Sequence, residues 1–314
     1  MFKIARAPAV GLQLLIIGAG LGLAYNPAKA AQDWSGFASR LASRTASPNF
    51  KTSQRIDAAG KGLVGDGKTD NTMALQKLLG DGNRTIHISA GDYVTGKLEI
   101  PKNTVLLLDP GVILRDSGKL GPYDRLINIQ SDNVYIKGQG AKVVADRNSY
   151  QGGEQRHGVF IFGASNVVID GLDSSGNSGD GFYIGGPRGK PAQHVVLEDC
   201  SAGYNRRQGL SITSGRDVDV VNCVFSHTKG TAPQFGVDIE PNDPSNPLDG
   251  IRLVGVRTED NYGGGVSVYL GSKYTAPGGA HIAIIDHKSI GEAHRYQVVG
   301  PRGAGRSITY RPVK

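Results

Sequence analysis

One short motif recurs along the second half of the chain and sharply limits how the chain can fold. Each copy is a glycine followed by an apolar, a variable and an apolar residue, and consecutive copies lie 23 to 29 residues apart. The copies start at Gly158, Gly181, Gly209, Gly236 and Gly265. Alternation with a period of two is typical of a short β-strand. Short strands at this spacing predict a parallel β-solenoid in which each repeat forms one turn.

A second short strand follows each of these motifs. Its copies occupy residues 167–169, 195–197, 218–220, 251–253 and 282–284, and weaker copies lie at 85–88, 105–108 and 133–136. A leucine-rich repeat of similar length would need a Leu/Asn frame and an intervening helix, and propeller blades have a longer period. The chain is therefore expected to be all-β and to form a single-stranded parallel β-helix.

An open solenoid end exposes strand edges and needs a cover. Residues 70–79 are expected to form a capping helix that plugs the N-terminal mouth, with Thr69 or Asp70 as its N-cap. The apolar side of this helix would consist of Met73, Leu75, Leu78 and Leu79.

The N-terminus has the pattern of a secretory signal peptide. Lys3 and Arg6 form its basic part, residues 10–23 are almost wholly apolar or glycine, and residues 28–30 give a small-x-small cleavage pattern. We therefore expect residues 1–30 to be removed and the protein to be secreted or periplasmic. No membrane partner is expected after cleavage; an uncleaved anchor is the alternative.

The remaining chain is expected to comprise a polar, flexible lead-in at 31–54 and one β-helix domain at 55–314. The formal net charge is +7, and the three basic residues within 1–30 leave +4 for the rest. This mild excess favours an anionic partner or serves only solubility. Because basic runs interleaved with aromatic residues are lacking in the sequence, nucleic acid is not expected. The sequence does not predict an oligomeric state.

Three segments carry a resemblance to a known family. Residues 65–72 (GDGKTDNT), together with Ala74 and Gln76, resemble the opening of the pectate lyase superfamily. Residues 86–93 are similar to the strand and turn that follow the cap in that family, and residues 138–140 to its next turn. The resemblance implies a right-handed parallel β-helix and a polysaccharide partner. It does not choose a reaction, because the superfamily includes lyases, hydrolases, epimerases, tailspikes and binding proteins.

The repeat also predicts which side chains face the solvent. Residues one and three after each glycine are apolar and should point inward, so residues two and four should point outward. These outward positions are Phe160/Phe162, Tyr183/Gly185, Ser211/Thr213, Asp238/Glu240 and Ser267/Tyr269. Asp238 and Glu240 would lie about 6.5–7 Å apart. That spacing suits an inverting glycosidase pair, and the faces of Tyr183 and Tyr269 suit sugar rings.

The turns that enter these strands add polar candidates. Stacking places Asp180 next to Gln208, with Arg207 near both. Arg207 would bind a substrate carboxylate or sulfate, or pair with Asp180, whereas Arg206 is expected to be solvated. Residues 177–181 and 208–212 loosely resemble polygalacturonase segments. Here the expected Asp pair is missing and Gln208 stands in the place of a histidine, which argues against ordinary polygalacturonase chemistry.

Other candidates follow from residue type. Asn242 and Asp243 lie in an insertion near Asp238 and Glu240, so a calcium site is an alternative, although no cofactor is expected. His227 is either a base or a surface residue. Cys200 and Cys223 share a column and form either a disulfide or two inward thiols stacked with Leu172 and Val256.

These features lead to one principal hypothesis and two alternatives. The principal hypothesis is an exported enzyme that hydrolyses an acidic or bacterial exopolysaccharide, with Asp238, Glu240 and Asp180 as catalytic residues. The expected substrate contacts are Tyr183, Arg207, Gln208, Ser211, Asn242 and Tyr269. The first alternative is a polysaccharide lyase or C5-epimerase that uses Arg207 with Tyr269 or His227. The second is a polysaccharide-binding or surface structural β-helix without activity.

Overall fold

The computed structural model describes residues 52–150, 152–300 and 307–313. The expected signal peptide at 1–30, and the expected lead-in as far as residue 51, lie outside the described residues. The solenoid begins with β1, one residue before the domain start expected from the sequence.

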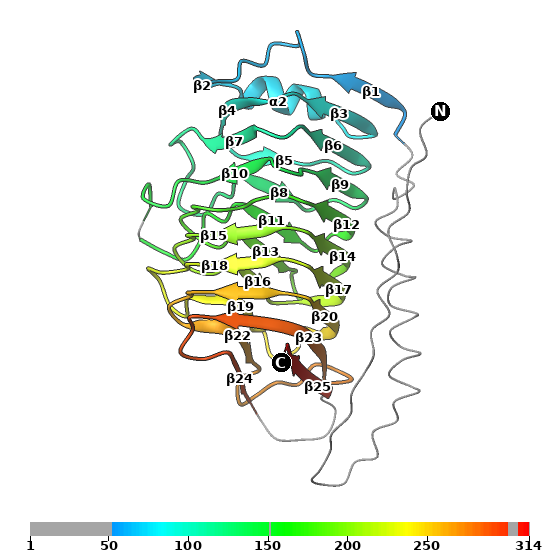
Figure 1. Cartoon of the computed structure of the whole chain (residues 1–314). Coiled ribbons are helices and arrows are strands. Elements are labelled where there is room, and N and C mark those ends of the chain that lie inside the picture. The colour runs from blue at the N-terminus through cyan, green and yellow to red at the C-terminus, as the bar shows by residue number, and fades with distance from the viewer. Residues whose placement is uncertain (1–51, 151, 301–306, 314) are drawn as a thin grey trace, which may run out of the picture. The chain divides into compact units, whose positions relative to one another are not determined.

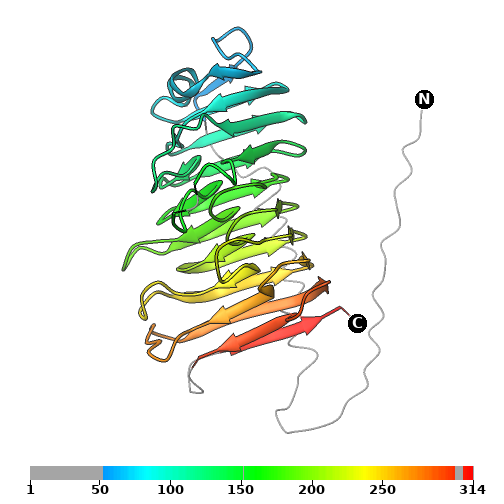
Figure 2. The same cartoon turned by 90° about the vertical axis from the view of Figure 1, so that its left-hand side faces the viewer.

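The described chain winds into a parallel β-helix whose turns stack along one axis (Figures 1 and 2). Three sheets form its faces. The first face consists of β1 (Gln54–Asp57), β3 (Arg84–Ile88), β6 (Thr104–Leu108), β9 (Val134–Lys137), β12 (Ser165–Asp170), β14 (Ala192–Glu198), β17 (Gly215–Val221), β20 (Leu248–Val254), β23 (Ala280–Ile290) and β25 (Ser307–Pro312).

The second face consists of β2 (Asp66–Asp70), β4 (Gly91–Thr95), β7 (Val112–Asp116), β10 (Lys142–Val144), β15 (Ser201–Gly203), β18 (Val224–Ser226) and β21 (Arg257–Glu259). Bridges from Asp173 to Lys142 and Ser201 connect its two halves, and the long β23 also pairs with β21. The third face consists of β5 (Leu98–Glu99), β8 (Ile127–Ile129), β11 (Val159–Phe162), β13 (Phe182–Gly185), β16 (Leu210–Ile212), β19 (Phe235–Ile239), β22 (Gly264–Tyr269) and β24 (Tyr296–Val299).

The strand register confirms the columns predicted from the repeat. On the first face one column runs through Val167, Val195, Val218, Ile251 and Ile282. On the third face the outward column runs through Phe160, Tyr183, Ser211, Asp238 and Ser267. Residues far apart in sequence therefore lie about one strand spacing, roughly 4.8 Å, from each other.

The recurring glycine has a steric cause. At Gly209 a Cβ atom would lie 2.6 Å from the carbonyl oxygen of Gly236, and at Gly181 it would lie 2.5 Å from the Ala202 Cβ. Both distances are shorter than van der Waals contact, because the chain turns sharply between the second and third faces. Only glycine fits where the backbones approach so closely.

The inward side chains form one continuous apolar core. The inward members of the glycine motif are fully buried, as predicted: Val159, Phe182, Leu210, Val237 and Val266. Cys200 and Cys223 belong to the same core as Leu172 and Val256, and both are free thiols. Of the two alternatives for the cysteines, the structure thus has the inward thiol stack.

Helix α2 (Thr72–Leu79) lies at the N-terminal end of the solenoid and packs on β3, β4 and β5 (Figure 1). Leu75 and Leu79 are buried, but Met73 is 83% exposed, so the prediction that Met73 joins the apolar side is wrong. The N-cap is Asn71 rather than Thr69 or Asp70, because the helix begins at Thr72, two residues later than predicted. Within the described parts of the chain, none of the helices has the length and apolar character needed to cross a membrane.

A ladder of asparagines supports the turns before the first face. Asn83, Asn103, Asn133 and Asn166 all have positive φ, a conformation that asparagine tolerates well. The amides of the last three each donate to the side-chain oxygen of the asparagine on the previous turn, over 2.8, 2.9 and 3.0 Å. These bonds satisfy polar groups that stacking would otherwise leave unpaired.

Candidate functional site

The outward column of the third face borders two adjoining hollows. The outer hollow has a volume of about 460 Å³, and a smaller inner hollow extends from it toward Tyr183. The residues that line both are Glu154, Arg207, Asp238, Glu240 and Asn242. A concave site of this size, with polar groups that converge on it, is where a ligand is expected to bind.

Asp238 and Glu240 lie next to both hollows, Asp238 within β19 and Glu240 directly after it. Asp238 is only 3% exposed, so the expectation of a solvent-facing carboxylate is wrong. Burial and the charge of Glu240 raise the pKa of Asp238 to about 7. Burial also raises the pKa of Glu240, whereas a hydrogen bond with Asp238 lowers it. That combination indicates that Asp238 holds the proton and donates it to the Glu240 carboxylate.

The two carboxyl groups are closer than strand geometry predicted. Asp238 and Glu240 are within hydrogen-bond reach, not about 6.5–7 Å apart. Glu240 follows Ile239, the last residue of β19, so its side chain is no longer held at strand spacing. In this state the pair does not have the separation of about 6.5–9.5 Å that inverting glycosidases use.

Gln208 holds the Asp238 carboxyl from the neighbouring turn. Its Nε2 donates to Asp238 Oδ2 over 3.2 Å, and its Oε1 accepts the backbone N–H of Phe235 over 2.6 Å. Gln208 is fully buried and lines neither hollow. It therefore positions Asp238, and the direct substrate contact expected from the sequence does not match its place in the structure.

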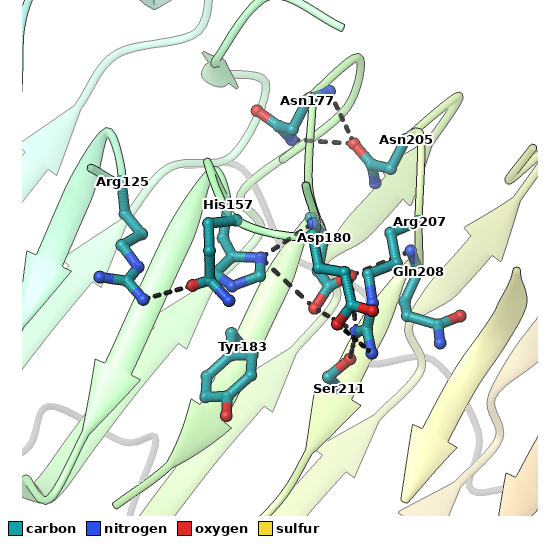
Figure 3. A network of polar contacts seen from close by, with 12 residues as sticks. Arg125, His157, Asn177, Asp180, Tyr183, Asn205, Arg207, Gln208 and Ser211 are labelled. Atoms are coloured by element: carbon teal, nitrogen blue, oxygen red, sulfur yellow. Dashed lines mark hydrogen bonds and ion pairs between the residues drawn. The ribbon is translucent and has the colours of Figure 1, made fainter. Parts of the chain in front are cut away.

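Asp180 lies between His157 and Arg207 (Figure 3). Arg207 Nη1 is 3.1 Å from Asp180 Oδ2, and the backbone N–H of Gln208 donates to Asp180 Oδ1 over 3.1 Å. Arg207 also pairs with Glu154 over 3.4 Å. Burial alone would lower the pKa of Arg207, but the charges of Asp180 and Glu154 outweigh it and raise this pKa. Because Asp180 is fully buried and lines neither hollow, it positions Arg207, and its expected catalytic role is not supported by its place.

His157 has a defined tautomer. Its Nδ1 accepts the backbone N–H of Asp180 over 3.0 Å, so the proton of the neutral ring lies on Nε2. Burial lowers the pKa of His157 to about 4, although the charge of Asp180 opposes this, and the ring stays neutral. Within the described chain its Nε2 has no hydrogen-bond partner, and His157 lines the inner hollow. This N–H is therefore both unpaired and buried in the described chain.

Buried polar side chains support the turns that carry these groups. Asn177 Nδ2 donates to Asn205 Oδ1 over 2.9 Å on the next turn (Figure 3). Arg206 is 8% exposed and donates to the carbonyl oxygens of Ser178 and Gly153. The expectation that Arg206 is solvated is therefore wrong, because its guanidinium ties two loops together.

The structure brings most of the expected site residues together. The expected residues that line one or both hollows are Tyr183, Arg207, Ser211, Asp238, Glu240, Asn242 and Tyr269. His227 lines neither hollow; it stacks on Tyr204 and lies 3.6 Å from Asp260. Sequence reasoning missed Glu154 and Gln155, since they lie in a segment without any repeat pattern.

The charge of the site differs from that of the whole chain. Among the described residues that line the hollows, three carry carboxyl groups and one a guanidinium: Glu154, Asp238, Glu240 and Arg207. Arg207 is already paired with Asp180 and Glu154. The excess of carboxyl groups disfavours an anionic sugar at this position, in contrast to the acidic substrate suggested by the net charge.

The calcium alternative receives no support from the described residues, where no group of three or more His, Cys, Asp or Glu side chains is arranged to hold a metal ion. Asp243 accepts hydrogen bonds from the backbone N–H and the hydroxyl of Ser245, over 2.8 and 2.5 Å. These bonds turn the Asp243 carboxylate toward its own loop.

A family model described as a right handed beta helix region matches residues 86–278. The chain belongs to this right-handed β-helix family. The resemblance to the pectate lyase superfamily is thereby confirmed as a likeness of fold. The family matches most of the solenoid, including every residue of the site from Glu154 to Tyr269.

Two relatives of this β-helix protein illustrate its range. It is 28% identical over 223 residues to the uncharacterized protein YclG of Bacillus subtilis (strain 168). The aligned residues cover 59% of this chain and 38% of YclG. It is 23% identical to the pre-neck appendage protein of Bacillus phage phi29, over 75% of this chain and 29% of that protein. The chain therefore spans well under half the length of either relative.

Two solved structures share the fold. The crystal structure of the pre-mature bacteriophage phi29 gene product 12 has a TM-score of 0.66 at 17% identity, over 88% of this chain and 38% of that chain. The second structure is a 1,3-α-1,4-β-D-galactose-4-sulfate-3,6-anhydro-D-galactose-2-sulfate 4 galactohydrolase. It has a TM-score of 0.59 at 14% identity, over 80% of this chain and 61% of that chain. The fold is thus shared by glycosidases and phage proteins. The function of this chain therefore has to be argued from the residues of its site.

Proposed function

We propose that this β-helix protein hydrolyses a glycosidic bond of a polysaccharide. Asp238 is the proton donor, and Glu240 is the carboxylate that activates water. For this step the Glu240 side chain, which follows the last residue of β19, has to turn away from Asp238 and admit substrate and water between the two carboxyl groups. The observation that carries the proposal is this carboxyl pair in one hollow, with the pKa of the buried member raised to about 7. A general acid works best when its pKa is near the working pH.

The surroundings of the pair fit a sugar. Tyr269 is 42% exposed beside the outer hollow, where its ring offers an apolar face to a sugar ring. Ser211 and Asn242 supply hydrogen-bonding groups. Because the hollows carry an excess of carboxyl groups, we propose a neutral or amino-sugar polymer as substrate.

The lyase or epimerase alternative is less well supported. Those reactions need a cation that neutralises the substrate carboxylate. Arg207 is the one cation among the described residues that line the hollows, and it is already shared between Asp180 and Glu154. Its Nε lacks a hydrogen-bond partner within the described chain but is itself buried.

The non-catalytic alternative is favoured by one observation, the similarity to a phage appendage protein. Such a protein would bind polysaccharide without turnover. We also propose export, on the strength of the signal pattern in residues 1–30.

The experiment that tests the proposal measures new reducing ends and unsaturated uronate absorbance on neutral, amino-sugar and uronate polysaccharides. We expect reducing ends without absorbance, and loss of that activity in Asp238→Asn and Glu240→Gln. The surface variants Asp286→Asn and Glu259→Gln serve as matched controls with full activity. Unsaturated products would support a lyase instead, and retention on a polysaccharide without turnover would support the binding module.

A further inference from the structure

The column through Asp238 is covered on one side and open on the other. Toward the N-terminal end of the solenoid, it continues through Ser211 to Tyr183 and Phe160, which are 8% and 5% exposed. Toward the C-terminal end the same face carries Tyr269, which is 42% exposed and lines the outer hollow. The hollow therefore has one closed side and one open side.

The closed side is a wall built by residues 154–157. Gln155 and His157 line the inner hollow, and the His157 ring stacks on Tyr183 with 4.8 Å between centroids. Arg125 donates to Gln155 Oε1, and its guanidinium lies 4.2 Å from the centroid of the Phe160 ring. These contacts cover the positions where further sugars of a long chain would continue along the column.

The wall is fixed by bonds to several other parts of the chain. Arg156 Nε donates to the Gly121 carbonyl over 3.1 Å, and its Nη1 donates to Ser149 Oγ over 2.8 Å. Arg206 donates to the Gly153 carbonyl from the other side. A sugar chain that displaced the wall would have to break these bonds and leave buried polar groups unpaired, which is unfavourable.

The insertion after β19 closes the inner hollow further. Asn242 Nδ2 donates to Tyr183 OH over 2.7 Å, and Thr213 Oγ1 donates to the same hydroxyl over 3.0 Å. The Tyr183 ring is thus stacked on His157, while its hydroxyl group is held by these two bonds. The inner hollow has a volume of only about 60 Å³, enough for about two water molecules and not for a sugar ring. A chain whose end lies in the outer hollow therefore has no room to continue toward Tyr183.

We propose that the site accepts the terminal part of a polysaccharide and that the protein acts from chain ends. This inference rests on the proposed function, and it adds the part of the polymer that is recognised. A chain end fits this arrangement because the hollow that borders Asp238 and Glu240 is closed on the side of residues 154–157 and Tyr183. The rest of the chain leaves through the open side, past Tyr269.

Product analysis with the full chain tests the inference. The probe is a hexasaccharide labelled at its reducing end, prepared from whichever polymer of the neutral, amino-sugar and uronate panel is cleaved. We expect a single labelled product at the earliest time points, which is either one short fragment or the probe shortened by one such fragment, while the viscosity of the intact polymer falls little. A ladder of all intermediate lengths at early times, with a rapid fall in viscosity, would overturn chain-end action and leave the proposed hydrolysis intact.

A variant that opens the wall provides a second test. Arg125→Ala removes the guanidinium that bonds Gln155 and covers the Phe160 ring, so we expect internal cleavage products to appear. Arg216→Ala, which removes an exposed arginine of the first face, is the matched control and should keep the short-product pattern. If the Arg125→Ala variant does not fold, the Gln155→Gly variant is measured in its place. Unchanged products in a folded wall variant would contradict the role of the wall.

Binding decides the question even without turnover. With Asp238→Asn, calorimetric titration with fractions of the same polymers of different length should saturate at a constant amount of protein per chain end. Saturation in proportion to polymer mass would show internal binding and overturn the inference. Absence of binding to every polymer of the panel would overturn both this inference and the proposed function.

Discussion

Gln208 Nε2 donates to Asp238 Oδ2 over 3.2 Å, while Gln208 Oε1 accepts the backbone N–H of Phe235 over 2.6 Å. The second bond decides which end of the amide faces Asp238, because a carbonyl oxygen cannot donate. A residue from the neighbouring turn thus fixes the orientation of a buried carboxyl group and leaves its other oxygen to carry the proton.

We expect Gln208→Leu to shift the alkaline limb of kcat/KM to higher pH. The lost hydrogen bond favours the ionised form of Asp238, so its removal raises the pKa of Asp238 further. The unpaired N–H of Phe235 should also lower the free energy of unfolding by about 1–3 kcal/mol in urea titrations. Gln193→Leu, on the partly exposed first face, is the control; an unshifted limb in Gln208→Leu would contradict the positioning role.

The activity should fall as the pH rises through about 7. Asp238 must be protonated to donate, and burial followed by the charge of Glu240 raises its pKa to about 7. Measurement of kcat/KM between pH 4 and 10 checks this. An alkaline limb that persists in a catalytically active Asp238→Asn variant would show that another group is responsible.

The same shift links stability to pH. The pKa of Asp238 rises from 3.8 to about 7 on folding, so the folded state binds the proton more tightly than the unfolded state. The stabilisation from this proton is complete below the pKa of Asp238 in the unfolded state. It is lost as the pH rises through the pKa of Asp238 in the folded state. We expect Asp238→Asn to gain stability relative to the parent protein by up to about 1.4 kcal/mol per pH unit within this window. Thermal melts at several pH values measure it, and Asp286→Asn should show no such trend.

Asp180→Asn should destabilise the protein strongly and reduce its activity. The change removes the buried charge that faces Arg207 and leaves Glu154 and the Ser211 hydroxyl as partners of the guanidinium. Breaking a buried pair in this way costs about 3–5 kcal/mol. Urea unfolding compares this variant with Asp286→Asn, an exposed aspartate whose change should stay within about 0.5 kcal/mol. Equal stability of the two variants would contradict a structural role for Asp180.

Tyr269→Ala should raise KM more than it lowers kcat. Its exposed ring lies at the open side of the outer hollow, away from the proton-sharing pair, so it contributes to binding rather than to proton transfer. The control is Tyr262→Ala, because Tyr262 is 67% exposed and lines neither hollow. A fall in kcat alone would argue against this role for Tyr269.

The two thiols should be inert in the native protein. Cys200 and Cys223 are buried in the core, and burial followed by contact with Cys200 raises the pKa of Cys223. A thiol-specific reagent should label neither residue under native conditions and both after unfolding by guanidinium. Rapid labelling of the folded protein would contradict the inward column.

The sequence predicted the fold and the members of the columns but not their burial. Asp238, Glu240 and Tyr183 were placed on one stripe because strand alternation is local and the repeat sets the stacking. The positions of the loops could not be predicted in this way. The segment around Glu154 has no repeat, and nothing in its local pattern indicates that it borders the same hollows as Asp238 and pairs with Arg207.

By itself, the sequence determined that this chain is a β-helix and which residues share a column, because period-two alternation and turn length act within single repeats. Only the tertiary structure decided that Asp238 is buried, that Asp180 and Gln208 position other groups, and that the site is closed at Tyr183. These properties depend on contacts between distant loops, such as that of Arg206 with Gly153, and no local pattern specifies such contacts.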